Sequence, residues 1–383
     1  MTRRPPSMPE PTHPPTPPGV SLTGFGYAFF AYDAGLAIDL AAASLTLGEA
    51  RHRQITVQRR RAAPWLAYEP APLCITHRLD RSPAGPFAID PDAECTLFDF
   101  GAISVRYRVP IAGRPGTLPA LADFLYDNDD LLADSRRRVE EICGALGDAI
   151  AKPRLAHLVE DYTVLAVHAW SPACDASELL DREGDALARA VLAEPGGLSP
   201  GHVEEALASR ASFTRRDAVI VGFDAAVVLD PEPSDVLAVL EHANVELAEM
   251  RLLDQQLDLV LERSYRLLQE HGTRRFWPGG PGSHHLRRLA ELQMDNAILF
   301  ENVNNAIKLV GDQYLARVYR LAGARLHLPE WDQTILRKLE TAESIYQKIV
   351  DAQTARRMEL LEIIIVLLIA VSLILPFLPI PGH

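Results

Sequence analysis

The sequence has little lysine, little cysteine and no paired metal-ligand motif. No Gly-Lys dipeptide occurs anywhere, which excludes a Walker A phosphate loop. Arginine carries nearly all the positive charge, since the lysines are only Lys152, Lys308, Lys338 and Lys348. The cysteines are Cys74, Cys95, Cys143 and Cys174, with no C-x-x-C pair among them. This spacing argues against a zinc site and favours reduced, structural thiols over a disulfide framework.

Net positive charge is also missing. The chain of 383 residues has 38 basic and 51 acidic side chains, a formal charge of −13. A protein that coats nucleic acid needs a dense basic surface, so direct nucleic-acid contact is not expected. The length and the 48% hydrophobic content are enough for one large or two ordinary domains with substantial cores. No motif indicates a cofactor.

The two ends of the chain differ sharply. Eight prolines lie in the first nineteen residues, so residues 1–20 are predicted to be a disordered proline-rich tail. No apolar stretch of signal-peptide length follows, so a secretory signal is not expected. Near the other end, Ile363–Ile380 contains no charge. With Leu360 and Leu361, and with Glu362 placed at the membrane interface, the segment reaches about 20 residues, the length that crosses a bilayer.

Residues 359–380 are therefore predicted to form a transmembrane anchor. The alternative is a buried core helix, since Pro376 limits the regular part of the segment. Arg356 and Arg357 flank the segment on its N-terminal side, so the positive-inside rule predicts a cytoplasmic or mitochondrial-matrix body and a tail-anchored topology. The anchor side chains are Ile363, Ile364, Ile365, Val366, Leu367, Leu368, Ile369, Val371, Leu373, Ile374 and Leu375.

Residues 21–230 are predicted to form an α+β domain, because strand-like and helix-like runs alternate irregularly. Glu94–Ile111 has two β-rich runs around Gly101-Ala102 and predicts a hairpin. Further strands are expected over 26–32, 163–170 and 218–229, and helices over 34–47, 118–132, 135–150, 176–193 and 200–208.

Residues 231–358 are predicted to form a stalk of long antiparallel helices. Ser234–His271 has apolar residues at heptad spacing, interrupted by Asp254, and a second helix carries Asn296 in its seam. The two polar residues are expected to set helix register. Trp277–Ser283 ends the first helix, and a third begins near Pro329 and runs into the anchor. The heptads fit either a homo-oligomer or an intramolecular three-helix bundle.

Two stretches resemble a known family. Arg337–Leu375, with Trp331 upstream, and Thr96–Val109 resemble the C-terminal helix and the hairpin of the "required for meiotic nuclear division" (YagE-like) proteins, a family of unknown function. The resemblance implies a homo-oligomeric membrane protein, since eukaryotic relatives support organellar translation by holding components at an inner membrane. It supplies no catalytic residues. The bias of arginine over lysine and the lack of a transit peptide predict a bacterial member of the family, located in the inner membrane.

Candidate polar sites are few. Asp127–Asp130 provides carboxylates for a cation, although a solvated helix end explains the same residues. His157 lies near Glu160 and Asp161, His284 and His285 are adjacent, and Ser283 lacks a nucleophile-elbow motif; none of these predicts a catalytic or metal site. One basic cluster, Arg51, Arg53, Arg59, Arg60 and Arg61, is a possible contact patch for ribosomal, RNA or lipid surfaces, or else a solvated loop.

The sequence as a whole predicts a non-catalytic, tail-anchored scaffold. It would self-associate and tether an unknown protein partner to the lipid bilayer, and the family resemblance implies that this partner is translation-related. The alternative is a membrane-anchored enzyme whose α+β domain acts on a small molecule or a nucleic acid. That alternative requires Asp127–Asp130, His157 or the Arg59–Arg61 cluster to converge in one pocket.

Overall fold

A computed structural model describes residues 19–49, 55–58, 70–78, 85–273, 294, 297–298, 300 and 313–374. The predicted proline-rich tail lies almost entirely outside this range. So do Trp277–Ser283, the two adjacent histidines, Asn296, Leu375 and all of the basic cluster, which comprises Arg51, Arg53, Arg59, Arg60 and Arg61. The four cysteines all lie within it and form no disulfide there.

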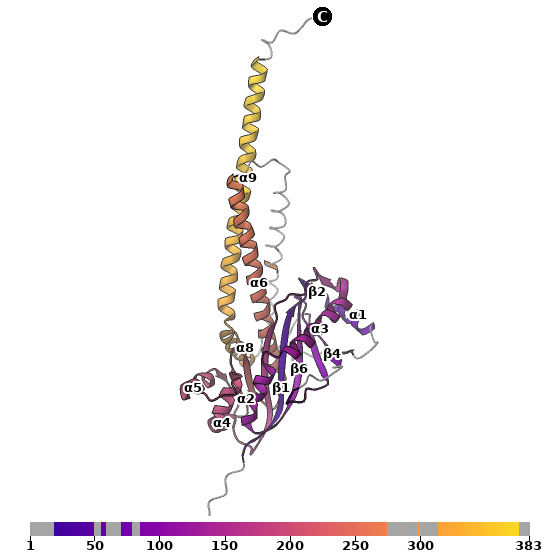
Figure 1. Cartoon of the computed structure of the whole chain (residues 1–383), viewed down its shortest axis with the longest axis vertical. Helices are drawn as coiled ribbons and strands as arrows, with labels where there is room; N and C mark the ends of the chain where they lie inside the picture. Colours follow the sequence, from indigo (N-terminus) through magenta and orange to yellow (C-terminus); the bar gives the residue numbers. More distant parts are fainter. Residues whose placement is uncertain are drawn as a thin grey trace, which may run out of the picture.

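A sheet of nine strands forms the centre of the described fold, in the order β3-β4-β5-β6-β1-β8-β11-β10-β9 (Figure 1). All neighbouring strands are antiparallel except β8 and β11, which are parallel. The strands are β1 Ser21–Asp33, β3 Ile55–Gln58, β4 Leu73–Arg78, β5 Asp92–Leu97, β6 Ala102–Gly113, β8 Glu160–Ser171, β9 Arg210–Ala211, β10 Ala218–Val221 and β11 Ala225–Leu229. A small ribbon pairs β2 (Ala37–Ile38) with β7 (Ile150–Ala151).

Helices cover both faces of the sheet, so the central strand β1 is buried on both sides. Phe30 and Tyr32 of β1 pack toward one helical layer, whereas Tyr27 and Phe29 pack toward the other. The first layer contains α1 (Leu40–Glu49), α2 (Leu118–Leu125), α3 (Asp129–Leu146) and α4 (Ala176–Val191), with α5 (Pro200–Ala208) beside it. The second contains α6 (Ser234–Thr273), α8 (Gln313–Arg325) and the start of α9 (Leu328–Ile374). The predicted α+β class is confirmed.

Turn residues explain where the ends of several strands and helices differ from the sequence predictions. The β5–β6 hairpin forms as expected and turns at Gly101, whose φ is +101°. The strand predicted over 218–229 is two strands, β10 and β11, separated by Gly222-Phe223-Asp224. The helix predicted over 118–132 is broken because Asp127 has a φ of +46° and Asn128 caps α3 by accepting from the Leu131 N–H.

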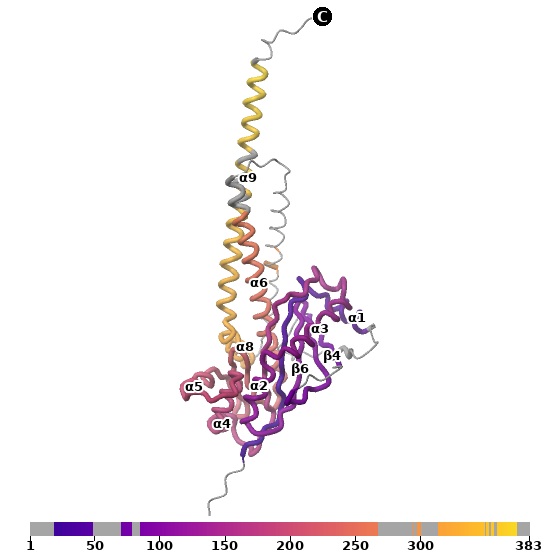
Figure 2. Tube along the Cα trace, in the orientation of Figure 1, coloured from indigo at the N-terminus to yellow at the C-terminus, as the bar shows by residue number. Residues whose placement is uncertain are grey.

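Two long helices, α6 and α9, extend from the sheet as a stalk (Figures 1 and 2). With 40 and 47 residues they are about 60 and 70 Å long. Buried Val260 lies with Ala342 between them, and Lys338 bridges Asp254 and Asp258, both at 2.6 Å. Asp254 thus makes a cross-helix contact, in keeping with its expected role in register.

The described stalk helices α6 and α9 are the first and third helices of the predicted stalk, and they run parallel to each other, as alternate helices of an antiparallel three-helix arrangement do. Most of the predicted second helix lies outside the described residues. Asp254 meets Lys338, and further along both helices Leu261 meets Tyr346. The chain has returned to the sheet by Gln313, where α8 packs against β9 and β10, so α9 leaves in the same direction as α6. The heptad residues in the first half of α6 pack on the sheet and on α8, and only the second half forms the two-helix stalk.

No helix within the described residues is long and apolar enough to cross a membrane.

Candidate functional site

The first half of α6 is buried on every side, and it carries an unusual number of polar groups. It lies between the sheet and the helices α8 and α9, and residues 239–250 are all buried. Five of these residues are polar, and each is at most 5% exposed: Glu241, His242, Asn244, Glu246 and Glu249. Because buried polar groups need partners to offset lost hydration, their surroundings define the candidate site.

One set faces the central strands around Arg106 of β6. The Arg106 guanidinium pairs with Glu94 and lies 5.5 Å from the Tyr27 ring centroid and 5.9 Å from that of Phe29. Burial lowers the pKa of Arg106, but the charges of Glu241 and Glu94 outweigh burial and raise it. Arg106 therefore stays cationic while almost fully buried, and it is the positive centre of this face.

A second contact fixes α6 to β8. The Asn244 side-chain amide donates to the Glu160 carbonyl at 3.1 Å, and the Glu160 carboxylate pairs with Arg251, which directly follows the buried residues 239–250. Burial raises the pKa of Glu160, and the adjacent Arg251 partly opposes this increase. Glu160 had no role in the sequence prediction; the structure places it at the point where α6 leaves the sheet.

A third set faces α8. The Tyr319 hydroxyl donates to Glu246 at 2.5 Å, and the His242 ring lies 6.4 Å from the Tyr319 ring. Burial raises the pKa of Glu246 to about 8 and lowers that of His242 to about 4. At neutral pH the carboxyl is therefore largely protonated and the imidazole neutral, so this contact carries little net charge.

The fourth set is a pair of carboxyl groups. Asp33, at the end of β1, and Glu249 interact with each other and with Arg154, whose N–H donates to the Ala34 carbonyl. Neither carboxyl oxygen of Glu249 has a hydrogen-bond partner within the described residues. Burial raises the pKa of Asp33 to about 7 and raises that of Glu249 well above its usual range.

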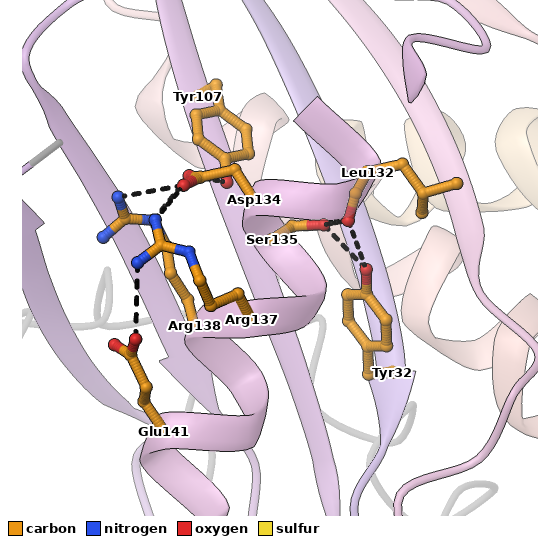
Figure 3. Close-up of polar contacts among 8 residues, drawn as sticks. All are labelled: Tyr32, Tyr107, Leu132, Asp134, Ser135, Arg137, Arg138 and Glu141. Atoms are coloured by element: carbon orange, nitrogen blue, oxygen red, sulfur yellow. Dashed lines mark hydrogen bonds and ion pairs between the residues drawn. The ribbon is translucent and has the colours of Figure 1, made fainter. Parts of the chain in front are cut away.

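The opposite face of the sheet has a polar cluster of a different kind (Figure 3). Asp134 on α3 accepts from the Tyr107 hydroxyl at 2.7 Å and from Arg138 Nε at 2.7 Å, and it also pairs with Arg137. Burial raises the pKa of Asp134, but the bonds from Arg138 and Tyr107 outweigh burial and lower it. Nearby, the Tyr32 and Ser135 hydroxyls are 2.7 Å apart. This cluster is ionised and well partnered, as expected of a structural contact.

The α6 site can hold protons, and its geometry does not suggest metal binding. In the described part of the chain, no three His, Cys, Asp or Glu side chains are placed to hold a metal ion. The site combines one buried cation, Arg106, with carboxyl groups that favour protonation, as on Asp33, Glu246 and Glu249. Its contacts link strands β1, β6 and β8 to the helix that becomes the stalk.

The predicted site residues fall elsewhere. Asp127 donates its N–H to Asp161, and Asp129 and Asp130 lie in the first turn of α3, which fits a solvated helix end. Among the described residues no hydrogen bond or ion pair joins His157 to Asp127–Asp130. The apolar side chains from Ile363 to Ile369, together with Val371 and Leu373, are exposed on α9. The side chains of Arg356, Arg357 and Ile374 lie outside the description.

Sequence reasoning missed the α6 site for a specific reason. Glu241, His242, Asn244, Glu246 and Glu249 occupy positions between the heptad residues, where a stalk helix has its solvent face. The polar residues between the heptad positions are visible in the sequence. However, the same pattern fits a solvent-exposed helix face and a buried face whose polar groups are paired, so the sequence does not distinguish the two.

The fold and site define a class: a three-layer α+β domain that continues into a helical stalk. The chain belongs to the family described as "Uncharacterized protein MJ0711, N-terminal domain", whose family model matches residues 23–235. It is 26% identical over 180 residues to the uncharacterized protein MJ0711 of Methanocaldococcus jannaschii, covering 45% of this chain and 53% of that protein. The chain thus spans about half the length of the curated relative it matches. No solved structure matches.

These comparisons confirm membership of a family of unknown function. They do not support the finer prediction, because the matching family is not the "required for meiotic nuclear division" family and the relative is archaeal, not bacterial.

Proposed function

We propose that this protein is a non-catalytic membrane scaffold, which holds a partner protein near a bilayer through its α+β domain. The observation that carries the proposal is the course of α9. This helix begins against the sheet at Leu328, runs along α6 and continues to Ile374 as one helix of 47 residues. Its last part extends beyond α6, so the sheet domain and the apolar end are joined by one continuous rod (Figure 1).

The end of α9 is apolar all around. The nine Ile, Val and Leu side chains from Ile363 to Ile369, with Val371 and Leu373, are each 50% exposed or more. A helix without a polar face suits lipid better than water. At about 0.3–0.6 kcal/mol each, nine such residues favour insertion by about 3–5 kcal/mol.

The described apolar part, residues 363–374, is about 18 Å long and by itself is shorter than a hydrocarbon core of about 30 Å. The proposal therefore depends on the sequence that follows, residues 375–380, which contains no charge. Arg356 and Arg357 favour a cytoplasmic location of the body by the positive-inside rule. The proposal does not depend on the family resemblance or on a bacterial source.

Self-association is part of the proposal. Leu259 and Tyr265 on α6, and Leu336 on α9, are exposed apolar side chains on the stalk, at 52%, 53% and 46% exposure. Side chains of this kind along a long helix pair are suited to contacts between copies. Chemical crosslinking of the full chain in membranes tests this point: we expect dimers or higher species, and a monomer at all crosslinker concentrations contradicts it.

The test of anchoring compares two charge insertions in the full chain. Ile365→Arg with Leu368→Arg adds about 5–7 kcal/mol of insertion cost, more than the apolar residues supply. We expect this variant to move from the carbonate-resistant membrane fraction to the soluble fraction. The control, Leu259→Arg with Tyr265→Arg, places the same charge on exposed stalk positions and is expected to stay with membranes. If the wild-type chain is extracted by carbonate, the anchoring proposal is wrong.

A further inference from the structure

One surface of the α+β domain is rich in arginine although the protein as a whole is acidic. It consists of the edge strand β9 with the loop 212–217, and of α8 packed beside them. We call it the arginine surface, and its basic residues are Arg210, Arg215, Arg216, Arg317, Arg320 and Arg325. Neither segment has an acidic residue except Asp217, whereas the whole chain has a formal charge of −13.

Direct contacts hold these segments together as one surface. Arg317 donates to the Ser212 carbonyl at 3.5 Å, and Arg325 donates to Ser209 Oγ at 2.6 Å. Arg320 is one turn beyond Arg317 on α8, and both are exposed. Arg215 and Arg216 are exposed on the loop itself. Cationic side chains from two distant parts of the sequence therefore lie next to one another.

An exposed aromatic ring lies on the same surface. Phe213 is 73% exposed, and its ring centroid lies 5.7 Å from that of Tyr314 on α8. The loop that carries Phe213 is held firmly, since Asp217 accepts from the N–H groups of Phe213 and Thr214, both at 2.7 Å. Asp217 is itself only 7% exposed, and its one negative charge is outnumbered by the six arginines of the surface. A large apolar side chain held in water by a braced loop is typical of an interface anchor.

We propose that the arginine surface docks an acidic segment of a partner protein, with an apolar pocket or side chain of that segment receiving Phe213. Arginine and aromatic residues are the types enriched at protein–protein contacts, and arginine binds carboxylates through two parallel hydrogen bonds. This inference rests on the proposed function, because it names the chemistry of the partner that the scaffold would hold.

The observations favour an acidic protein over a nucleic acid. Phe213 is the one strongly exposed aromatic among the described residues of this surface, since the Tyr314 ring is half-buried, so one base at most would find a stacking platform. Acidic residues lie next to the surface: the Glu205 carbonyl accepts from Arg325, and the charge of Asp230 acts on Tyr314. A long polyanion would meet these charges, whereas a short acidic segment fits between them.

The test selects peptides without bias. Random twelve-residue peptides displayed on phage are selected on the full chain in mild detergent, and the products are measured as fluorescein-labelled peptides by anisotropy. We expect enrichment of Asp and Glu around an aliphatic or aromatic residue, with binding that weakens as salt rises. Arg317→Glu with Arg320→Glu should weaken binding more than tenfold. Phe213→Ala should weaken it about tenfold.

Matched control variants distinguish a specific role of the arginine surface from nonspecific effects of reversing charge or removing an exposed phenylalanine. Arg263→Glu with Arg266→Glu makes the same charge change on the exposed stalk, and Phe223→Ala removes a different exposed phenylalanine, in the β10–β11 turn. Both should bind as the wild type does. The proposal is overturned if no peptide is enriched, if enriched peptides are not acidic, or if the controls lose binding equally.

Two further outcomes are informative. A fluorescein-labelled uridine 20-mer provides the nucleic-acid arm; if it binds and requires Arg317 and Phe213 while peptides fail, the acidic-protein proposal is wrong. Because the selection uses detergent-solubilised protein, it does not depend on membrane insertion. A chain that binds acidic peptides but is extracted by carbonate would retain this inference and lose the anchoring proposal.

Discussion

Asp33 on β1 and Glu249 on α6 are buried carboxyl groups that interact with each other across the boundary between the sheet and the stalk helix. Arg154 is the cation that opposes the increase in their pKa values, and Glu249 has no hydrogen-bond partner within the described residues. Two neighbouring carboxyl groups in a dry interior are stable together only when at least one is protonated. The attachment of α6 to β1 is therefore coupled to proton binding.

This coupling predicts a specific pH dependence. The pKa of Asp33 is about 7 in the folded chain and is raised from 3.8, so the folded state binds the proton more tightly than the unfolded state. The contribution of Asp33 to the free energy of unfolding is therefore fully present below about pH 4. It is lost as the pH rises through the folded pKa of about 7. A shift of this size corresponds to about 4 kcal/mol.

The variant Asp33→Asn removes this titration. We expect urea unfolding of the wild-type full chain in detergent to give a smaller free energy at pH 8.5 than at pH 5, and the difference to shrink in the variant. Glu204→Gln, at an exposed position on α5, is the matched control and should keep the wild-type pH dependence. A wild-type stability that is equal at both pH values would contradict the proposed protonation of this pair.

Asp134 predicts a pH dependence of stability opposite in direction to that of Asp33. Its pKa is lowered because the bonds from Arg138 and Tyr107 outweigh burial, so the stability it contributes is present above pH 4 and is lost as pH falls through the folded pKa (Figure 3). Asp134→Asn leaves the Arg138 side chain, 3% exposed, without its carboxylate, and we expect a loss of about 3 kcal/mol in the free energy of unfolding at pH 7.

The control for Asp134 is Glu141→Gln, at an exposed carboxylate that pairs with Arg137 at 3.3 Å. A surface pair of this kind contributes about 0.5 kcal/mol, so this variant should unfold almost as the wild type does. Equal losses for the two variants would show that the buried position of Asp134 does not matter.

Lys338 should hold the two stalk helices together. Burial lowers its pKa, but the hydrogen bonds to Asp254 and Asp258 outweigh burial and raise it. Lys338→Met leaves those carboxylates facing an apolar side chain, so we expect about 1–2 kcal/mol less local stability and 5- to 30-fold faster amide exchange in α6 near residue 258. Lys348→Met, at an exposed site on α9, should leave exchange unchanged. Faster exchange in both variants would assign the effect to lost charge alone.

Gly101 should be irreplaceable in the β5–β6 hairpin. A Cβ atom built at this residue lies 1.9 Å from the Gly35 carbonyl oxygen, and its φ of +101° is strained for any other residue. We expect Gly101→Ala to lower the melting temperature strongly, with a cost above about 2 kcal/mol. Gly144→Ala, at an exposed position of α3 with open space around it, should instead gain about 0.5–1 kcal/mol. A neutral Gly101→Ala would contradict the close approach to Gly35.

Much of the fold could be predicted because local patterns set it. The hairpin around Gly101-Ala102 follows from β-rich runs flanking a glycine, and α6 follows from the apolar residues at heptad spacing in the segment that begins at Ser234. The break at Asp127–Asn128 and the turn at Gly222 were missed, since a positive φ at Asp127 and a tight turn between two apolar strands leave a weak sequence signal.

The candidate site could not be predicted, because it depends on which surface covers α6. Glu246 finds the Tyr319 hydroxyl and Asn244 finds the Glu160 carbonyl only after helices and strands distant in sequence are packed together. The arginine surface has the same origin, since Ser212 and Arg317 meet only where α8 lies against β9.

The sequence by itself determined the acidic charge, the α+β class, the long helices and the apolar stretch at Ile363–Ile380, since composition and periodicity act within one segment at a time. Only the tertiary structure decided that α9 packs directly along α6, that the polar residues of α6 are buried, and that six arginines share one surface with Phe213. These properties depend on contacts between distant segments, and their free energies depend on burial, which no local pattern contains.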